Sequence, residues 1–177
     1  RTVIRTREPG GTEGAEAIRN LLVNGDTNRW TARAEALLNN AARDSHLEAV
    51  IRPALTRGNV VICDRFMDST RAYQGYAGGC SQSFIDALEA DVVGTTRPDP
   101  PVIFNFDPQQ GLARAGGRGE TAAEDRYERK GLAFHQLLRE GFLAIAKADP
   151  RRCRVIDAGQ GIEAVSASVW DAVRDLF

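Results

Sequence analysis

The sequence predicts an α/β fold in which a parallel sheet lies between layers of helices. Short apolar runs typical of strands alternate along the chain with longer segments whose apolar residues recur at helical spacing. The composition, 42% hydrophobic and 27% charged, is that of a globular protein, and 177 residues fit one domain. We therefore expect a single three-layer domain over residues 1–177.

Four apolar runs are the candidate strands: residues 2–4 (TVI), 60–63 (VVIC), 102–104 (VIF) and 155–156 (VI). The second and third are continuous rather than alternating, which is typical of strands covered on both faces. We expect both of these strands to be buried.

Helical periodicity fills the segments between these runs. A long helix is expected over residues 31–57, with Gly58 as its stop, and Leu37 belongs to its apolar stripe. In a later helix over residues 127–147, Leu137 and Leu138 are expected to face inward. The remaining helices are expected after the turn at residues 9–11 and over residues 84–93, 108–114 and 162–176.

Charge and cysteine content narrow the function classes. A net charge of −1 offers no basic field for a nucleic-acid polymer or a membrane surface, so any nucleic-acid link would be to a nucleotide. The three cysteines have neither metal spacing nor an even disulfide framework, and no signal peptide or long apolar span is apparent. These features indicate a reducing, cytoplasmic location. The two histidines, His46 and His135, are expected to be surface or packing residues.

Charged residues follow the predicted strands. Parallel sheets bind ligands beyond the carboxyl ends of their strands, which selects Arg7, Glu8, Asp64, Arg65, Asp107 and Asp157. At the end of the most hydrophobic strand, Asp64 can hold Mg²⁺ or its waters and Arg65 can hold phosphate oxygens. The alternative is a strand-end salt bridge combined with a helix cap.

A helix face follows this strand end. If residues 66–76 begin a helix, Ser69 and Tyr73 share one side at i,i+4 spacing. The Gln74 amide can pair with a base edge through both its donor and its acceptor. Tyr73 offers a flat wall beside a sugar, or else is an ordinary half-buried aromatic residue.

Arginines in two other segments are candidate ligand-binding residues. Arg43 lies within the apolar stripe of the long helix, where it needs a partner. It either forms an ion pair with Asp44 or Glu48 or reaches a base or phosphate. Residues 116–126 (GGRGETAAEDR) are glycine-rich and charged. They are either a solvated surface loop or a lid whose arginines, Arg118 and Arg126, close over a transferring phosphoryl group.

Five segments together resemble the bacterial type of the thymidylate kinase family, which has a P-loop nucleoside monophosphate kinase fold. They are residues 6–12 (TREPGGT), 41–43 (AAR), 64–75 (DRFMDSTRAYQG), 125–128 (DRYE) and 156–160 (IDAGQ). The likeness covers roughly residues 2–170, and the segment 64–75 is its most specific part.

This resemblance implies phosphorylation of dTMP to dTDP by ATP with Mg²⁺. It implies that Arg65 binds the dTMP phosphate with support from Arg7, and that Asp64 helps to place the metal. Arg43 and Gln74 would hydrogen-bond thymine. The other implied roles are packing against deoxyribose by Tyr73, a base-edge or turn contact by Ser69, pocket lining by Glu8 and Pro9, and closure over ATP by Arg118 and Arg126.

The sequence departs from the family pattern in two ways. Asn39 occupies the position where the family has a phenylalanine that stacks on thymine. The phosphate-loop motif GxxxxGK[ST] is also absent from the sequence. We expect the family's first strand and phosphate loop to precede Arg1. Without that strand, which is central in the sheet, two strand edges would be exposed.

These departures leave two alternatives to an active thymidylate kinase. One is a dTMP-binding fragment or pseudo-kinase without catalysis, and the other is a related kinase that acts on a different nucleoside monophosphate. The family resemblance also implies a homodimer, for which the long helix over residues 31–57 is a candidate interface.

Overall fold

The computed structural model describes residues 1–116 and 125–176 and has the α/β architecture with parallel strands that the sequence predicts. The strands are β1 (Val3–Arg7), β2 (Val60–Asp64), β3 (Val102–Asn105) and β4 (Arg154–Asp157). β1 pairs with β2 and β3 pairs with β4, both in parallel register. Within the described residues these are two separate two-stranded sheets.

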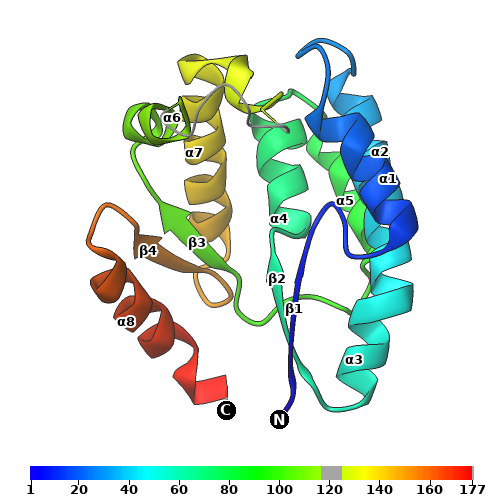
Figure 1. Ribbon diagram of the computed structural model, residues 1–177, viewed down its shortest axis with the longest axis vertical. Helices are drawn as coiled ribbons and strands as arrows, with labels where there is room; N and C mark the ends of the chain where they lie inside the picture. Colours follow the sequence, from blue (N-terminus) through cyan, green and yellow to red (C-terminus); the bar gives the residue numbers. More distant parts are fainter. Residues whose placement is uncertain (117–124, 177) are drawn as a thin grey trace.

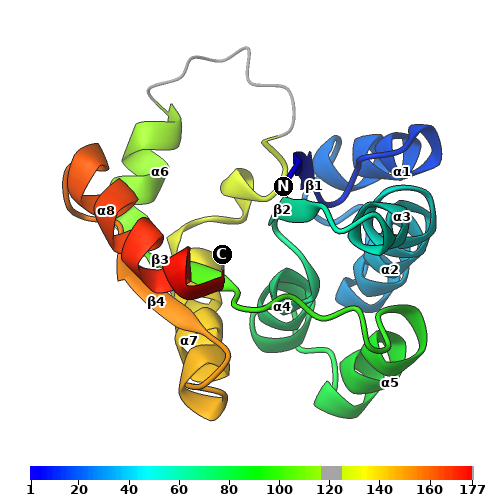
Figure 2. The same cartoon turned by 90° about the horizontal axis from the view of Figure 1, so that it is seen from below.

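The helices divide between the two sheets (Figures 1 and 2). Beside β1 and β2 lie α1 (Glu13–Val23), α2 (Ala32–His46), α3 (Arg52–Thr56) and α5 (Gln82–Val92). Beside β3 and β4 lie α6 (Pro108–Gly116), α7 (Leu132–Ala148), α8 (Ile162–Val173) and the short η4 (Arg174–Leu176). Between the two halves, α4 (Met67–Thr70) continues into a π-helical segment, η2 (Arg71–Tyr76), which packs against α7. No helix in the described ranges is long and apolar enough to cross a membrane.

The long helix predicted over residues 31–57 is confirmed as one helical run from α2 to α3. The Thr31 hydroxyl caps its start by accepting a hydrogen bond from the N–H of Ala34 at 3.2 Å. A π-helical segment, η1 (Leu47–Ile51), interrupts the α-helical pattern just before Pro53, which has no N–H to donate. Gly58, at φ 74°, follows the helix end as expected.

Three predictions about the helices are wrong. Leu37 is 48% exposed, because α2 buries small residues such as Ala36 and Ala42 on another face. Leu137 is 47% exposed, although its neighbour Leu138 is buried as predicted. The helix expected from residue 127 begins only at Leu132, since a 3-10 turn, η3 (Glu128–Lys130), ends at Gly131, whose φ of 84° cannot continue a helix.

The prediction that β2 and β3 are covered on both faces is also wrong for the described chain. Ile62 in β2 is 55% exposed and Phe104 in β3 is 56% exposed. The physical reason is a trough of about 2460 Å³ between the two sheets. Residues of β1, β2, β3 and α8 are among those that line it. The exposed strand edges that the sequence predicts are therefore present.

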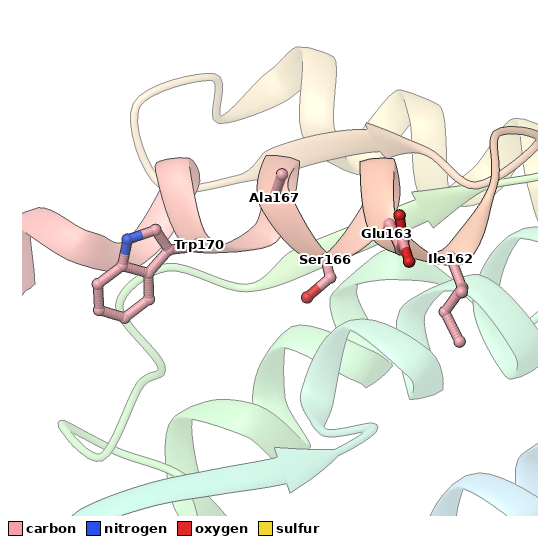
Figure 3. Close-up of a pocket in the computed structure, with 5 residues that line it drawn as sticks. All are labelled: Ile162, Glu163, Ser166, Ala167 and Trp170. Atoms are coloured by element: carbon pink, nitrogen blue, oxygen red, sulfur yellow. The ribbon is translucent and has the colours of Figure 1, made fainter.

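Helix α8 illustrates the openness of the second half. It has the predicted amphipathic pattern, yet none of its residues is buried. Figure 3 shows that Ile162, Ser166 and Trp170 project from one side of α8, where they border a shallow pocket of about 530 Å³. Ser166 and Trp170 also line the trough, so this face of α8 continues the apolar wall of the trough.

A compact contact joins α4 to the second half of the molecule. Arg152, just before β4, donates hydrogen bonds to both carboxylate oxygens of Asp68 at 2.8 Å, and both side chains are largely buried. Beside this ion pair, Ala72 of η2 packs into a buried apolar cluster that includes Ile103 and Leu138. The pair therefore holds the segment after β2 against the β3–β4 half.

We expect Asp68→Asn to lower the free energy of unfolding by about 2 kcal/mol, because it removes the buried charge partner of Arg152 and leaves this largely buried guanidinium only Asp149, which is 49% exposed. Urea unfolding followed by circular dichroism measures the change. Asp171→Asn is the matched control, because Asp171 is 65% exposed in its pair with Arg174 and should change stability by no more than about 0.5 kcal/mol. Equal effects of the two substitutions would contradict this account.

Candidate functional site

The carboxyl ends of β1 and β2 form the centre of the candidate site. The parallel register places Arg7 opposite Asp64, and the N–H of Glu8 donates to the carbonyl of Asp64 at 2.9 Å. Arg65 follows with a φ of 64°, a left-handed conformation that is uncommon for residues other than glycine. This turn takes the chain from the strand into α4 and leaves Asp64 and Arg65 exposed at the strand end.

The structure brings the predicted acceptor residues together. Ten of them, from β1, α2, β2 and α4–η2, line the same trough: Arg7, Glu8, Pro9, Asn39, Arg43, Asp64, Arg65, Ser69, Tyr73 and Gln74. Asp107, also selected by its place after a strand, lines this trough as well, whereas Asp157 does not. None of these residues borders the pocket on α8 in Figure 3.

Glu8 and Arg43 form a buried ion pair at the base of the site. The Nε of Arg43 donates to Glu8 at 2.7 Å, and the two side chains are 2% and 4% exposed. The partner proposed from the sequence, Asp44 or Glu48, is therefore wrong, because the acid comes from the end of β1 and not from the same helix. The ion pair joins the segment after β1 to α2.

The Arg43 guanidinium does not use all of its N–H donors in contacts with the described residues. Its Nη1 donates to the Asn40 side chain at 3.1 Å and its Nη2 donates to the Thr70 hydroxyl at 3.2 Å. A guanidinium has five N–H groups, so these contacts and the one to Glu8 occupy three of them. Among the described residues, two of its N–H groups have no partner, so they can serve a ligand in the trough that Arg43 lines.

Of the two alternatives that the sequence leaves for His46, a surface or a packing residue, the structure supports packing, and it adds two polar partners that were not predicted. The His46 ring is fully buried, its Nδ1 lies 3.1 Å from the second Glu8 oxygen, and its Nε2 lies 2.7 Å from the Thr6 hydroxyl. No local pattern could have revealed this contact, because Glu8 and His46 are 38 residues apart.

Glu8, His46 and Cys63 form a cluster whose ligand atoms lie within 4.8 Å of one another, a residue set that can bind zinc. The set does not fit a cation here. The Arg43 guanidinium already neutralises Glu8. Burial, with the Glu8 carboxylate second, raises the pKa of the Cys63 thiol well above its usual range, and this thiol donates to the Arg65 carbonyl at 3.1 Å. The cluster therefore serves the structure of the site.

Tyr73 forms a fixed aromatic wall. Its ring packs edge-on against Tyr127, Phe134 and Phe142 at centroid distances of 5.3, 6.1 and 6.4 Å. Its hydroxyl accepts a hydrogen bond from Arg65 at 2.9 Å. Tyr73 is therefore a half-buried aromatic residue that also holds the strand-end arginine in place.

Three other predicted residues line the trough with less fixed geometry. Arg7 is half-exposed and donates to Glu16 at 3.0 Å. Asn39 is half-buried, and its amide donates to the backbone carbonyl of Glu35 at 2.9 Å, one helical turn earlier. Ser69 is half-buried at the turn into η2. Arg7 and Asn39 thus have protein partners.

Gln74 is buried against an acid that sequence reasoning missed. Its Nε2 donates to Glu35 at 2.8 Å and lies 3.4 Å from the Tyr127 hydroxyl. Burial, together with the nearby Glu35 carboxylate, raises the pKa of Tyr127 well above its usual range, so this hydroxyl stays protonated. The available signal was a glutamate among alanines and leucines in the first turn of the long helix.

The two predicted lid arginines have different outcomes. Arg118 lies outside the described residues, as does most of the segment over residues 116–126. Arg126 is fully buried and donates to Glu35 at 2.6 Å and to three backbone carbonyls at the end of α1 and just beyond it. In this structure these four acceptors occupy the Arg126 guanidinium, so it faces protein and not a nucleotide.

The arrangement combines a parallel α/β scaffold, an acid and an arginine at a strand end, and a trough lined by an arginine, a glutamine and a tyrosine. A phosphate group suits the strand-end arginine, and a planar base suits the paired donor and acceptor groups beyond it. The fold and the site define a nucleoside monophosphate kinase.

Comparisons with known proteins identify the family. The family model described as thymidylate kinase matches residues 1–169. The thymidylate kinases of Caulobacter vibrioides and Nitrobacter winogradskyi are 55% and 48% identical to this chain over 97% of its length, and the matches cover 81% and 75% of their own lengths. The thymidylate kinase structure from Ehrlichia chaffeensis superposes with a TM-score of 0.73 and 32% identity, covering 99% of this chain and 82% of that one.

The chain belongs to the thymidylate kinase family, whose members phosphorylate dTMP to dTDP using ATP. The family resemblance read from the sequence is therefore confirmed.

The environment of Cys63 makes a pH-dependent prediction. Because burial raises the pKa of both thiols, and more so that of Cys63, less Cys63 than Cys80 is thiolate at pH 8. The thiolate is the nucleophile, so iodoacetamide should modify Cys80 first, and the Cys63 rate should keep rising up to pH 10. Peptide mass spectrometry measures both rates. Faster modification of Cys63 than of Cys80 at pH 8 would contradict the more strongly raised pKa of the Cys63 thiol.

Proposed function

We propose that the trough-lining residues of β1, α2, β2 and α4–η2 bind dTMP as the phosphoryl acceptor. The observation that supports this most directly is that ten residues from four separate parts of the chain line one trough. Thymine presents two carbonyl acceptors and one N–H donor. Among the residues that the structure describes, two N–H groups of Arg43 and the side-chain carbonyl of Gln74 make no hydrogen bond. These donors and this acceptor complement thymine.

The phosphate side is proposed to lie at the strand end. Arg65 would bind the dTMP phosphate through charge-assisted hydrogen bonds, with Arg7 supporting the same side. Tyr73 would pack against the deoxyribose, since its ring is fixed by three aromatic neighbours and its hydroxyl by Arg65. A rigid ring packed against the sugar would leave no room for the 2′-hydroxyl of a ribonucleotide.

The base side is proposed to lie between α2 and η2. Arg43 would donate to a thymine carbonyl, and Glu8 would hold Arg43 in position. Ser69 would contact the base edge, and Pro9 would line the nucleoside pocket. Asn39 stands where the resemblance places a stacking aromatic ring, and it offers only a small planar amide.

Mg²⁺ is proposed to be held by Asp64. The Asp64 carboxylate is exposed at the strand end and makes no hydrogen bond or ion pair with the residues that the structure describes. Mg²⁺ is typically held by one or two carboxylates together with substrate phosphates and waters, so the Asp64 site fits it. The bound ion would neutralise charge on the reacting phosphates. Arg118 is proposed to supply positive charge to ATP, and Arg126 to anchor the chain that follows Arg118.

The two sheets are proposed to be halves of one continuous sheet in a three-layer domain, with another parallel strand between β2 and β3. The support is the part of the trough beside Ile62 and Phe104, where both side chains are exposed and where no described residue pairs with the strand edges; the additional strand would fill this part and leave the residues at the strand ends to dTMP. Such a strand would carry the phosphate-binding loop for ATP. Amide hydrogen exchange of the intact enzyme tests this, because pairing would protect the edges of β2 and β3, and fast exchange at both edges would exclude it.

We also propose that residues 1–177 belong to one kinase domain that forms a homodimer in the cytoplasm. Leu37, exposed on the long helix, is the kind of apolar side chain that an interface covers. The three free cysteines suit a reducing compartment. Sedimentation equilibrium tests the dimer, and a monomeric mass at micromolar protein concentration would contradict it.

Arg65→Ala is expected to raise the KM for dTMP by about thirtyfold, equivalent to about 2 kcal/mol for a charge-assisted phosphate contact. A coupled assay of ADP formation and calorimetric titration of dTMP measure the effect. Arg151→Ala is the control, because Arg151 is exposed and does not line the trough. A dTMP affinity of Arg65→Ala equal to that of the control would refute the phosphate role.

Asn39→Phe is expected to tighten dTMP binding by about threefold to tenfold, because an aromatic ring at this half-buried trough position can stack on thymine. Asn39→Leu is the matched variant, since it adds apolar surface without a ring. Calorimetry with dTMP separates the two effects. If the leucine variant binds as tightly as the phenylalanine variant, base stacking at this position is disproved.

A further inference from the structure

We infer that Glu35 is a positioning residue that fixes the direction of the Gln74 side-chain amide and thereby makes the pocket select a base with an N–H donor. This inference rests on the proposed function, in which Gln74 contacts the base of the nucleotide. Gln74 lines the trough and Glu35 does not, so Glu35 would act through Gln74.

Glu35 is held as an acceptor. It is 1% exposed, in the first turn of α2, and its Oε1 accepts hydrogen bonds from Arg126 at 2.6 Å and from Lys130 at 3.3 Å. Arg126 is itself fully buried. Both partners are cationic groups that can only donate, so the Glu35 carboxylate is the acceptor in these contacts, and a carboxylate accepts hydrogen bonds but cannot donate them.

An acceptor at this place determines which end of the Gln74 amide faces it. The Glu35 Oε2 lies 2.8 Å from Nε2 of Gln74, and the reversed amide would place two oxygens at that distance. The same nitrogen also donates to the Tyr127 hydroxyl at 3.4 Å, so both of its contacts use the amide as a donor. The amide nitrogen is therefore held toward Glu35, and the carbonyl oxygen of Gln74 is the group left for a ligand.

A carbonyl oxygen in this position distinguishes between pyrimidines. Thymine and uracil carry an N–H donor at N3, which an acceptor binds, whereas cytosine carries an acceptor at N3, which an acceptor repels. A neutral amide at position 35 would accept either orientation of Gln74, because it has both a donor and an acceptor. Glu35→Gln should therefore weaken the discrimination between the two kinds of base.

The test compares dUMP with dCMP, since neither carries the 5-methyl group. Calorimetry should show that the unaltered protein binds dUMP at least about tenfold more tightly than dCMP, to which Arg43 also contributes. Equal affinities of the unaltered protein would overturn the inference without any variant. In Glu35→Gln, the ratio of the two dissociation constants should fall by about tenfold.

Kinetics separate positioning from general damage. Glu35→Gln should raise the KM for dTMP severalfold while kcat changes little, and its thermal unfolding establishes that it is folded. Glu48→Gln is the matched control, because Glu48 is exposed on the same helical run, and its discrimination ratio should not change. Glu35→Asp keeps the charge and should keep most of the discrimination.

A double-variant cycle decides whether Glu35 acts through Gln74. Gln74→Leu should lower the dUMP–dCMP ratio, and adding Glu35→Gln to it should lower the ratio no further. An unchanged ratio in Gln74→Leu would count against the proposed dTMP site itself. A reduced ratio in Gln74→Leu with an unchanged ratio in Glu35→Gln would overturn the role of Glu35 alone.

Discussion

The buried ion pair between Glu8 and Arg43 is the contact on which the rest of the site depends. Its 2.7 Å hydrogen bond joins the end of β1 to α2, and the same guanidinium reaches α4 through Thr70. Removing one partner would leave a charge buried without compensation, which is strongly destabilising. His46 and Asn40 complete the network. It holds the end of β1, α2 and α4 together, although these segments are far apart in the sequence.

Around this ion pair, the site has two ends with different physical character. At the strand end, the left-handed turn at Arg65 exposes Asp64 and Arg65 to solvent, as a phosphate and a metal ion require. At the other end, Gln74 is buried against Glu35, where a base edge can be read at low dielectric. Tyr73 lies between the two ends and contacts Arg65 at one of them. This layout matches the order of phosphate, sugar and base in the proposed dTMP binding mode.

The site residues selected from the sequence lie in local motifs at strand ends or on one helix face, and the structure brings ten of them to one trough. Prediction from the sequence failed for pairings between distant segments. The partner of Arg43, the burial of His46 and the role of Glu35 depend on contacts across 35 to 39 residues, which no local spacing reveals. The exposure of Ile62 also escaped prediction, because an apolar run indicates a strand but not whether a neighbour covers it.

A crystal structure of the protein with dTMP tests the central claim most directly, because it locates the nucleotide relative to named atoms. The account predicts the phosphate within hydrogen-bonding distance of Arg65, and thymine within hydrogen-bonding distance of Arg43 and of the Gln74 carbonyl oxygen. A nucleotide bound outside the trough, or a base that contacts neither Arg43 nor Gln74, would contradict it.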